Sequence, residues 1–179
     1  MVLTLFLMAP MAWGELGEEE YAVYAVLLKT VAYRPYVVQA ETGDAALTRD
    51  FQGRIEFLRQ ELQNQNPLVT LPDDLAAAYQ AVYAQSVPLD LSRLGVPAAR
   101  MVSRADVEHF MHTGGDFPKR YPGATIVTMS RVGFNKDRTK ALVAMSQHCG
   151  ALCGDAAYVI LERVGPKWVS RVRVIALYW

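Results

Sequence analysis

Apolar residues recur at helical spacing in the first two thirds of the chain and at every second position in the last third. The clearest helical pattern is formed by Phe51, Ile55, Leu58 and Leu62, because residues at i, i+4, i+7 and i+11 share one face of a helix. The stretch 21–28 is apolar on all sides and follows three glutamates, which are favourable at a helix N-terminus. Helices are therefore predicted to begin near residues 18, 51, 73 and 103, and a short strand is predicted over residues 36–41.

From Thr125 onward the period changes to two, which is typical of strands with one buried face. Strands are predicted over residues 125–132, 140–147, 157–163 and 167–175, with turn residues between them. In the last strand, Trp168 and Val174 are expected to face the core, while Arg171 and Arg173 are expected to face water.

Helices followed by strands indicate an α+β fold. Short loops between successive strands predict a C-terminal four-stranded antiparallel meander sheet, with the N-terminal helices packed on one of its faces. The chain has 179 residues, which suits one domain, and we place this domain over residues 15–179.

Residues 1–14 contain no charged side chain, and their apolar run is too short for a membrane-spanning helix, which needs about 20 residues. Ala12 and Gly14 place small residues where a signal peptidase would cut after residue 14. We expect a signal peptide here, no integral membrane span, and a periplasmic or secreted location. A buried N-terminal element is the alternative.

Composition excludes some classes of protein. Hydrophobic residues make up 52% of the chain and charged residues 20%, which indicates a folded core rather than disorder. The 18 basic residues balance the 18 acidic ones, and this disfavours a general nucleic-acid-binding function, which needs a positive excess.

The two cysteines, Cys149 and Cys153, lie close together between glycines and predict a disulfide across a tight turn. On the chain-entropy model a ring of this size contributes about 2 kcal/mol to stability. A redox pair, a metal site with His148 as a third ligand, and free thiols are the alternatives. The spacing matches no strong metal pattern, so we expect neither a metal nor a cofactor.

The segment 130–135 combines a strand end with polar residues. Ser130 and Arg131 could lie at the sheet edge, where Arg131 could bind a carboxylate or phosphate, and Asn135 suits the turn that follows. The alternative is a hairpin whose polar residues satisfy local backbone groups.

Several motifs in the last third occur in an order that resembles a family of uncharacterised exported bacterial proteins: Ser130-Arg131-Val132-Gly133-Phe134-Asn135, Cys149-Gly150-x-Leu152-Cys153-Gly154, Tyr158-Val159-x-Leu161-Glu162 and Gly165-x-x-Trp168. The opening Tyr21-x-x-Tyr24-x-x-x-Leu28 is also similar to that family. The resemblance implies export and paired cysteines, and it implies no reaction. The candidate binding residues are Ser130, Arg131, Asn135, His148 and Tyr158.

No catalytic spacing in the sequence is complete, because there is no Gly-x-Ser-x-Gly elbow and no phosphate-binding loop. The leading hypothesis is a non-catalytic exported module that binds a small ligand or an envelope protein. The alternatives are a hydrolase around Ser130, Arg131 and a histidine, a thiol-disulfide oxidoreductase at the two cysteines, and a subunit of a larger envelope assembly that docks through the apolar stretch 21–28.

Overall fold

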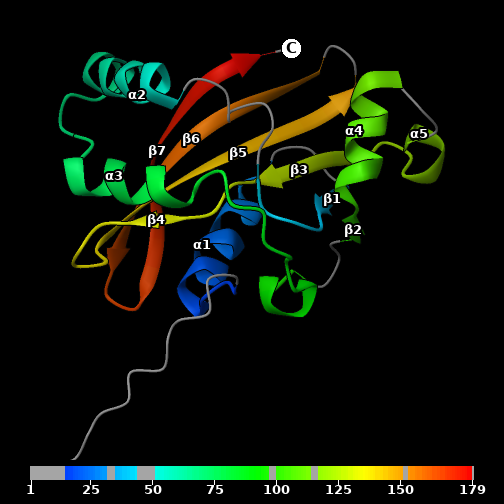
Figure 1. Cartoon of the computed structure of the whole chain (residues 1–179), viewed down its shortest axis with the longest axis horizontal. Helices are drawn as coiled ribbons and strands as arrows, with labels where there is room; N and C mark the ends of the chain where they lie inside the picture. The colour runs from blue at the N-terminus through cyan, green and yellow to red at the C-terminus, as the bar shows by residue number, and fades with distance from the viewer. Residues whose placement is uncertain are drawn as a thin grey trace, which may run out of the picture.

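The computed structural model describes residues 15–31, 35–43, 51–96, 100–113, 117–150 and 153–178, and the predicted signal peptide over residues 1–14 lies outside them. Within these ranges the chain forms one mixed sheet with helices on both sides (Figure 1). The elements are α1 (Glu18–Lys29), β1 (Tyr36–Gln39), α2 (Phe51–Gln65), α3 (Asp73–Val82), the 3-10 helix η1 (Leu91–Leu94), β2 (Arg100–Val102), α4 (Arg104–Thr113), α5 (Phe117–Arg120), β3 (Thr125–Met129), β4 (Gly133–Phe134), β5 (Lys140–Gly150), β6 (Cys153–Val164) and β7 (Lys167–Tyr178).

The seven described strands follow the order β2-β1-β3-β5-β6-β7, and β4 pairs with β5 beside this path. Strand β1 runs parallel to both β2 and β3. All other pairs are antiparallel, from β3 with β5 to β6 with β7. The sheet therefore has a parallel part built around β1 and an antiparallel part built around β5 and β6.

One face of the sheet, here called the α1 face, is covered by α1 and η1. Leu27 and Leu28 of α1 belong to one buried cluster with Val127, Val143 and Val159 of β3, β5 and β6. Burial of such side chains is the main favourable term in folding, at about 25 cal/mol per Å² of apolar surface.

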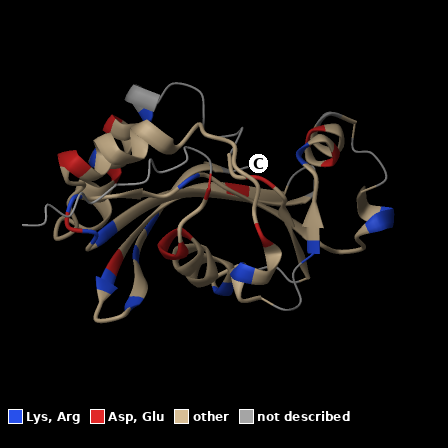
Figure 2. Ribbon diagram, turned by 60° about the horizontal axis from the view of Figure 1, so that its bottom comes forward, with Lys and Arg blue, Asp and Glu red and all other residues tan. Residues whose placement is uncertain are grey.

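The opposite face is covered at its two ends by different helices, and Figure 2 shows helices on both sides of the sheet. Helices α2 and α3 pack on β5, β6 and β7 through a cluster that includes Leu58, Leu75 and Tyr158. Helices α4 and α5 pack on β1, β2 and β3 through a cluster that includes Val107 and Phe117.

The prediction of a four-stranded antiparallel meander is wrong, because the α+β fold contains a seven-stranded sheet with both parallel and antiparallel pairs. The prediction omitted β1, β2 and β4 from the sheet. These strands are only four, three and two residues long, and β1 and β2 pair in parallel across a long crossover that local patterns cannot reveal.

The apolar helix α1 is not a docking surface for a partner. Tyr21, Tyr24, Leu27 and Leu28 are at most 4% exposed, since they form the core on the α1 face. A helix that is apolar on several sides is buried on several sides, as its sequence indicated.

Candidate functional site

Ser130 lies directly after β3, and its hydroxyl is fully engaged inside the protein. The Tyr79 hydroxyl and the Ala144 backbone N–H donate to Ser130 Oγ at 3.1 and 2.9 Å, and Ser130 Oγ donates to the Arg131 carbonyl at 2.8 Å. A serine hydroxyl has one donor and two acceptor positions, so these contacts use all of them. Ser130 is also only 1% exposed. The arrangement holds α3 and β5 to the end of β3.

Tyr24 joins the same network from α1. Its hydroxyl donates to the Ser130 carbonyl oxygen at 3.0 Å. Burial raises the pKa of the Tyr24 phenol well above its ordinary value, and the nearby Glu20 carboxylate raises it further. The phenol therefore stays protonated and keeps its hydrogen bond over the physiological pH range.

Arg131 forms a bidentate ion pair with Glu20 of α1, because Nε and Nη2 donate to the two carboxylate oxygens at 2.9 and 2.8 Å. Its Nη1 donates to the side chain of Gln85 at 3.1 Å. The Arg131 and Glu20 side chains are 13% and 7% exposed, so the pair is largely buried. Arg131 thus binds a carboxylate, as its type suggested, but that carboxylate belongs to its own chain.

Asn135 closes the turn between β4 and β5. Its Oδ1 accepts from the Lys140 backbone N–H at 2.7 Å, and its Nδ2 donates to Thr139 Oγ1 at 3.2 Å. These contacts match the alternative in which polar residues of this segment satisfy local groups. The structure therefore brings Ser130, Arg131 and Asn135 into the scaffold rather than into an accessible site.

Tyr158 of β6 is 1% exposed and lies in the core beneath α3. Its ring packs edge-on against Tyr79, with the centroids 6.2 Å apart and the planes at 88°. Tyr79 also donates to Ser130, so Tyr158 is linked to the Ser130 network by packing.

His148 of β5 is separated from that network and lies beside the cysteines. It is 6% exposed and faces the side of the sheet opposite α1, between Ile126 of β3 and Gly154 of β6. Cys149 and Cys153 form a disulfide with their Cα atoms 5.1 Å apart, which confirms the predicted cysteine pair. Within the described ranges no three His, Cys, Asp or Glu side chains gather into a metal site.

Burial lowers the pKa of His148 to about 4. Between pH 6.5 and 4 the unfolded chain binds a proton at this residue and the folded protein does not, so the free energy of unfolding falls as the pH falls through this window. We expect an NMR titration midpoint for His148 near pH 4. We also expect His148→Gln to flatten the pH dependence of urea unfolding in this window relative to the wild type. A His148 midpoint near 6.5 would contradict this prediction.

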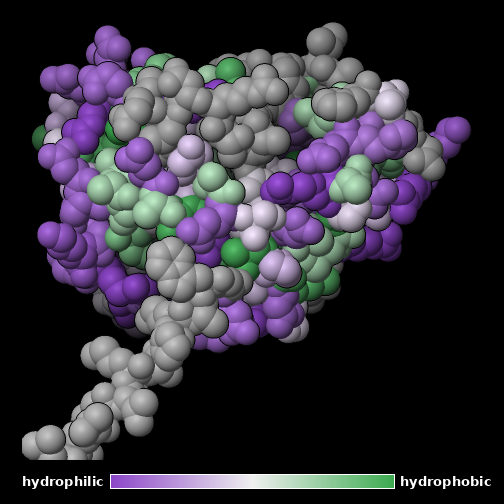
Figure 3. All heavy atoms as spheres, viewed as in Figure 1, coloured by the Kyte–Doolittle hydropathy of each residue, from purple (hydrophilic) through white to green (hydrophobic). Residues whose placement is uncertain are grey.

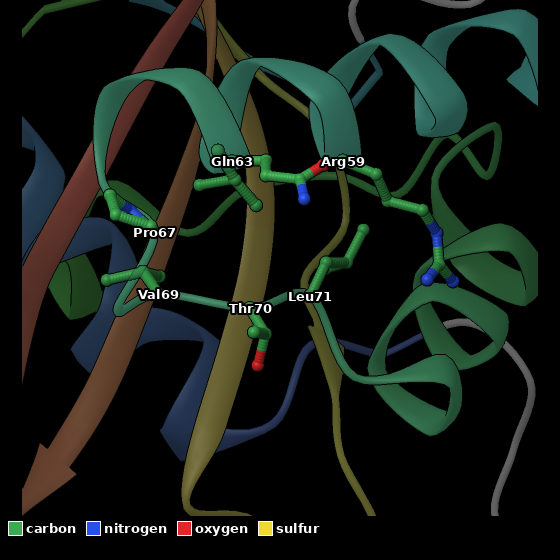
Figure 4. A pocket seen from close by; sticks show the side chains of 7 residues that line it. Arg59, Gln63, Pro67, Val69, Thr70 and Leu71 are labelled. Atoms are coloured by element: carbon green, nitrogen blue, oxygen red, sulfur yellow. The ribbon is translucent and has the colours of Figure 1, made fainter.

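A cleft lies between the end of α2 and the segment that leads into α3 (Figure 4). Its volume is about 280 Å³, and it is lined by Arg59, Leu62, Gln63, Pro67, Val69, Thr70 and Leu71. Arg59 donates to the Asp73 carboxylate at 2.5 Å across this cleft's end. The side chain of Leu68, between two lining residues, is 93% exposed.

Sequence reasoning missed this cleft. Its helix was predicted from Leu58 and Leu62, but nothing marked Arg59 or Gln63 among the other polar residues of α2. The available signal was Leu68, an apolar residue in a turn that follows Asn66-Pro67, where polar residues are the rule.

No helix in the described part of the chain is both long enough and apolar enough to cross a bilayer. No family model, curated protein or solved structure matches this chain.

Proposed function

We propose that this protein is an exported, non-catalytic module that binds another protein through the cleft between α2 and α3. Export is supported by the Cys149–Cys153 disulfide, because such bonds persist in oxidising compartments. A non-catalytic role is supported by Ser130 and Arg131, whose hydrogen-bonding groups are occupied within the fold.

The observation that carries the proposal is Leu68, which is 93% exposed and lies in the chain between Pro67 and Val69, two residues that line the cleft. On the face of the molecule drawn in Figure 3, hydrophilic and hydrophobic side chains are mixed, and the hydrophobic ones form separate groups. An exposed leucine beside a hollow supplies the apolar centre that protein interfaces use, with water excluded when a partner covers it.

The cleft suits a side chain rather than a whole small-molecule ligand. Its volume of about 280 Å³ lies below the range of about 300–1,000 Å³ that is usual for small-molecule sites. Leu62, Val69 and Leu71 offer apolar contact, and among the described residues of the lining only Arg59 is charged. An aliphatic or aromatic side chain of a partner protein can pack against these three residues.

Arg59 makes the cleft favour a partner that carries a negative charge. Its present partner, Asp73, has a side chain that is 91% exposed, and such surface pairs contribute about 0–1 kcal/mol. A carboxylate from a partner can therefore replace Asp73 at little cost. The expected occupant is an extended segment of an envelope protein in which an apolar residue lies next to Asp or Glu.

Selection of random displayed peptides against the purified protein tests this proposal. The enriched peptides should carry an aliphatic or aromatic residue within a few positions of Asp or Glu. Measured by fluorescence anisotropy, Leu68→Ser and Arg59→Gln should each raise the Kd of such a peptide at least about fivefold.

Matched controls lie at the other end of the molecule. Met111→Ser removes another exposed apolar side chain, 44% exposed on α4, and Arg120→Gln removes another exposed arginine that pairs with an aspartate. Both should leave the Kd unchanged. Enriched peptides that lack the expected pattern, or that bind Leu68→Ser and Arg59→Gln as tightly as the wild type, would overturn the proposal.

A further inference from the structure

A pocket opens at the end of the sheet where the three parallel strands begin. The first residues of β1, β2 and β3 are Tyr36, Arg100 and Thr125. The pocket has a volume of about 260 Å³, and its lining includes Pro35, Val37, Arg100, Tyr121, Pro122 and Ala124. It therefore lies in the part of the molecule where α4 and α5 cover the sheet, and it shares no lining residue with the α2–α3 cleft.

The walls of this pocket are held in place by the fold. Residues 121–124 form a β-turn, in which the Ala124 backbone N–H donates to the Tyr121 carbonyl at 3.0 Å. The turn contains proline and then a glycine with a φ of 65°, the residues that a turn of this kind favours. On the other wall, the Pro35 carbonyl accepts from the Thr125 backbone N–H at 3.0 Å. The pocket is therefore preformed, as small-molecule sites usually are.

Arg100 is the one charged residue among the described residues of the lining. Nine other arginines of the described ranges pair with an aspartate or glutamate. Arg100, by contrast, forms no hydrogen bond or ion pair through its side chain with any part of the chain that the structure describes. It is exposed and lies directly opposite Val37 on the neighbouring strand. An anion that binds Arg100 therefore displaces no internal partner.

We infer that this pocket binds a small aromatic carboxylic acid, with the carboxylate on Arg100 and the ring against Tyr121. A guanidinium group presents its donors in a planar fork that matches the two oxygens of a carboxylate. The Tyr121 ring is fixed from within by Phe117, with the two ring centroids 4.9 Å apart. Val37 and Ala124 add apolar contact, and the flat faces of the tyrosine and proline rings suit a flat ligand ring.

The size of the pocket limits the ligand to a single ring. A volume of about 260 Å³ is that of roughly nine water molecules in the liquid, at about 30 Å³ each. This space accommodates one ring with its carboxylate, and it lies below the range of about 300–1,000 Å³ that holds larger ligands. The inference goes beyond protein binding at the α2–α3 cleft, and neither depends on the other.

Calorimetry and thermal unfolding of the purified protein with benzoate as the probe test this inference. Benzoate should bind and raise Tm, because it stabilises the folded state alone. Benzyl alcohol keeps the ring without the charge, and acetate keeps the charge without the ring, so each should bind about tenfold or more weakly. Cyclohexanecarboxylate, whose ring is not flat, should also bind more weakly than benzoate.

Arg100→Gln separates the charge from the pocket. Because Arg100 makes no described contact that stabilises the fold, the variant should have the Tm of the wild type without ligand. Its Kd for benzoate should rise about tenfold or more, and its Kd for benzyl alcohol should stay unchanged. Arg59→Gln is the matched control, because Arg59 also lines a partly apolar hollow, and it should leave the Kd for benzoate unchanged.

The location of the ligand can be read directly by NMR, since nuclear Overhauser effects should connect the benzoate ring to the Tyr121 ring. The inference is overturned if benzoate does not bind, because Arg100 then only places a charge on the sheet edge. It is also overturned if Arg100→Gln binds benzoate as tightly as the wild type, or if acetate or cyclohexanecarboxylate binds as tightly as benzoate. Benzoate binding that Arg59→Gln weakens would move the ligand to the α2–α3 cleft and leave the peptide proposal intact.

Discussion

Replacing Glu20 with alanine is expected to lower the free energy of unfolding by about 3–5 kcal/mol. Glu20 accepts two hydrogen bonds from Arg131, and both side chains are largely buried. Its removal leaves the arginine charge desolvated and without its counter-ion, which costs more than the pair itself contributes. Urea unfolding followed by circular dichroism measures the change.

Two further variants distinguish the effect of leaving the Arg131 charge unpaired from the effect of removing a glutamate in general. Glu18→Ala removes a neighbouring carboxylate that is 85% exposed and pairs with Arg93, so the expected change is about 0–1 kcal/mol. The double variant Glu20→Leu with Arg131→Met removes both charges and should recover most of the stability. A Glu20→Ala protein that is no less stable than Glu18→Ala would show that Arg131 finds solvent or another partner.

Replacing Gly133 with alanine is expected to cost about 3 kcal/mol or more, at the upper end of the usual cost of overpacking. An added Cβ at Gly133 would lie 2.4 Å from the Cα and 2.5 Å from the backbone nitrogen of Tyr79. These are backbone atoms of α3, so the whole helix must shift to relieve the contact. The shift would also strain the hydrogen bond from Tyr79 to Ser130.

Gly17→Ala is the matched control for this prediction. The added Cβ at Gly17 meets no heavy atom within 4 Å, and its φ of −76° suits any residue. Gly17 makes no side-chain cap hydrogen bond, so the loss of stability should be about 1 kcal/mol or less, the typical size of an N-cap effect. If Gly133→Ala unfolds at the same urea concentration as Gly17→Ala, the close packing of α3 on β4 is not a constraint in solution.

Local patterns predicted the elements better than their pairing. The spacing of Ile55, Leu58 and Leu62 predicted α2, and the start of α4 was predicted from Ser103, which indeed accepts the Asp106 backbone N–H. These signals depend on residues within a few positions of one another. The parallel pairing of β1 with β2 joins segments about 60 residues apart and leaves no local trace.

A bulge explains why the predicted alternation in β7 fails. Ile160 pairs with Val172 and Leu161 with Ser170, so Arg171 is an extra residue that shifts the strand by one. Trp168 therefore packs on the α1 face, whereas Val174 packs on the opposite face. Arg173 lies on the α1 face and reaches Asp155 rather than pointing only to water.

In the candidate site, too, contacts between residues that are distant in the sequence could not be predicted. Ser130 and Arg131 stood out in the sequence as polar residues at a strand end, and their types correctly indicated hydrogen bonding and carboxylate binding. Their partners were not predictable, because Tyr79 and Glu20 lie 51 and 111 residues away. The kind of interaction that each side chain makes could thus be predicted from the sequence. The residue with which it interacts could not, because that depends on the fold.

The hydrogen bonds between α1 and distant parts of the chain affect when the protein can fold. Glu19 and Tyr24 of this first helix bond to Arg163 and Ser130, at separations of 144 and 106 residues. Contacts between distant segments slow folding, because loop closure precedes the contacts that stabilise it. A ribosome must therefore synthesise the chain through β6 before α1 can form both of these contacts.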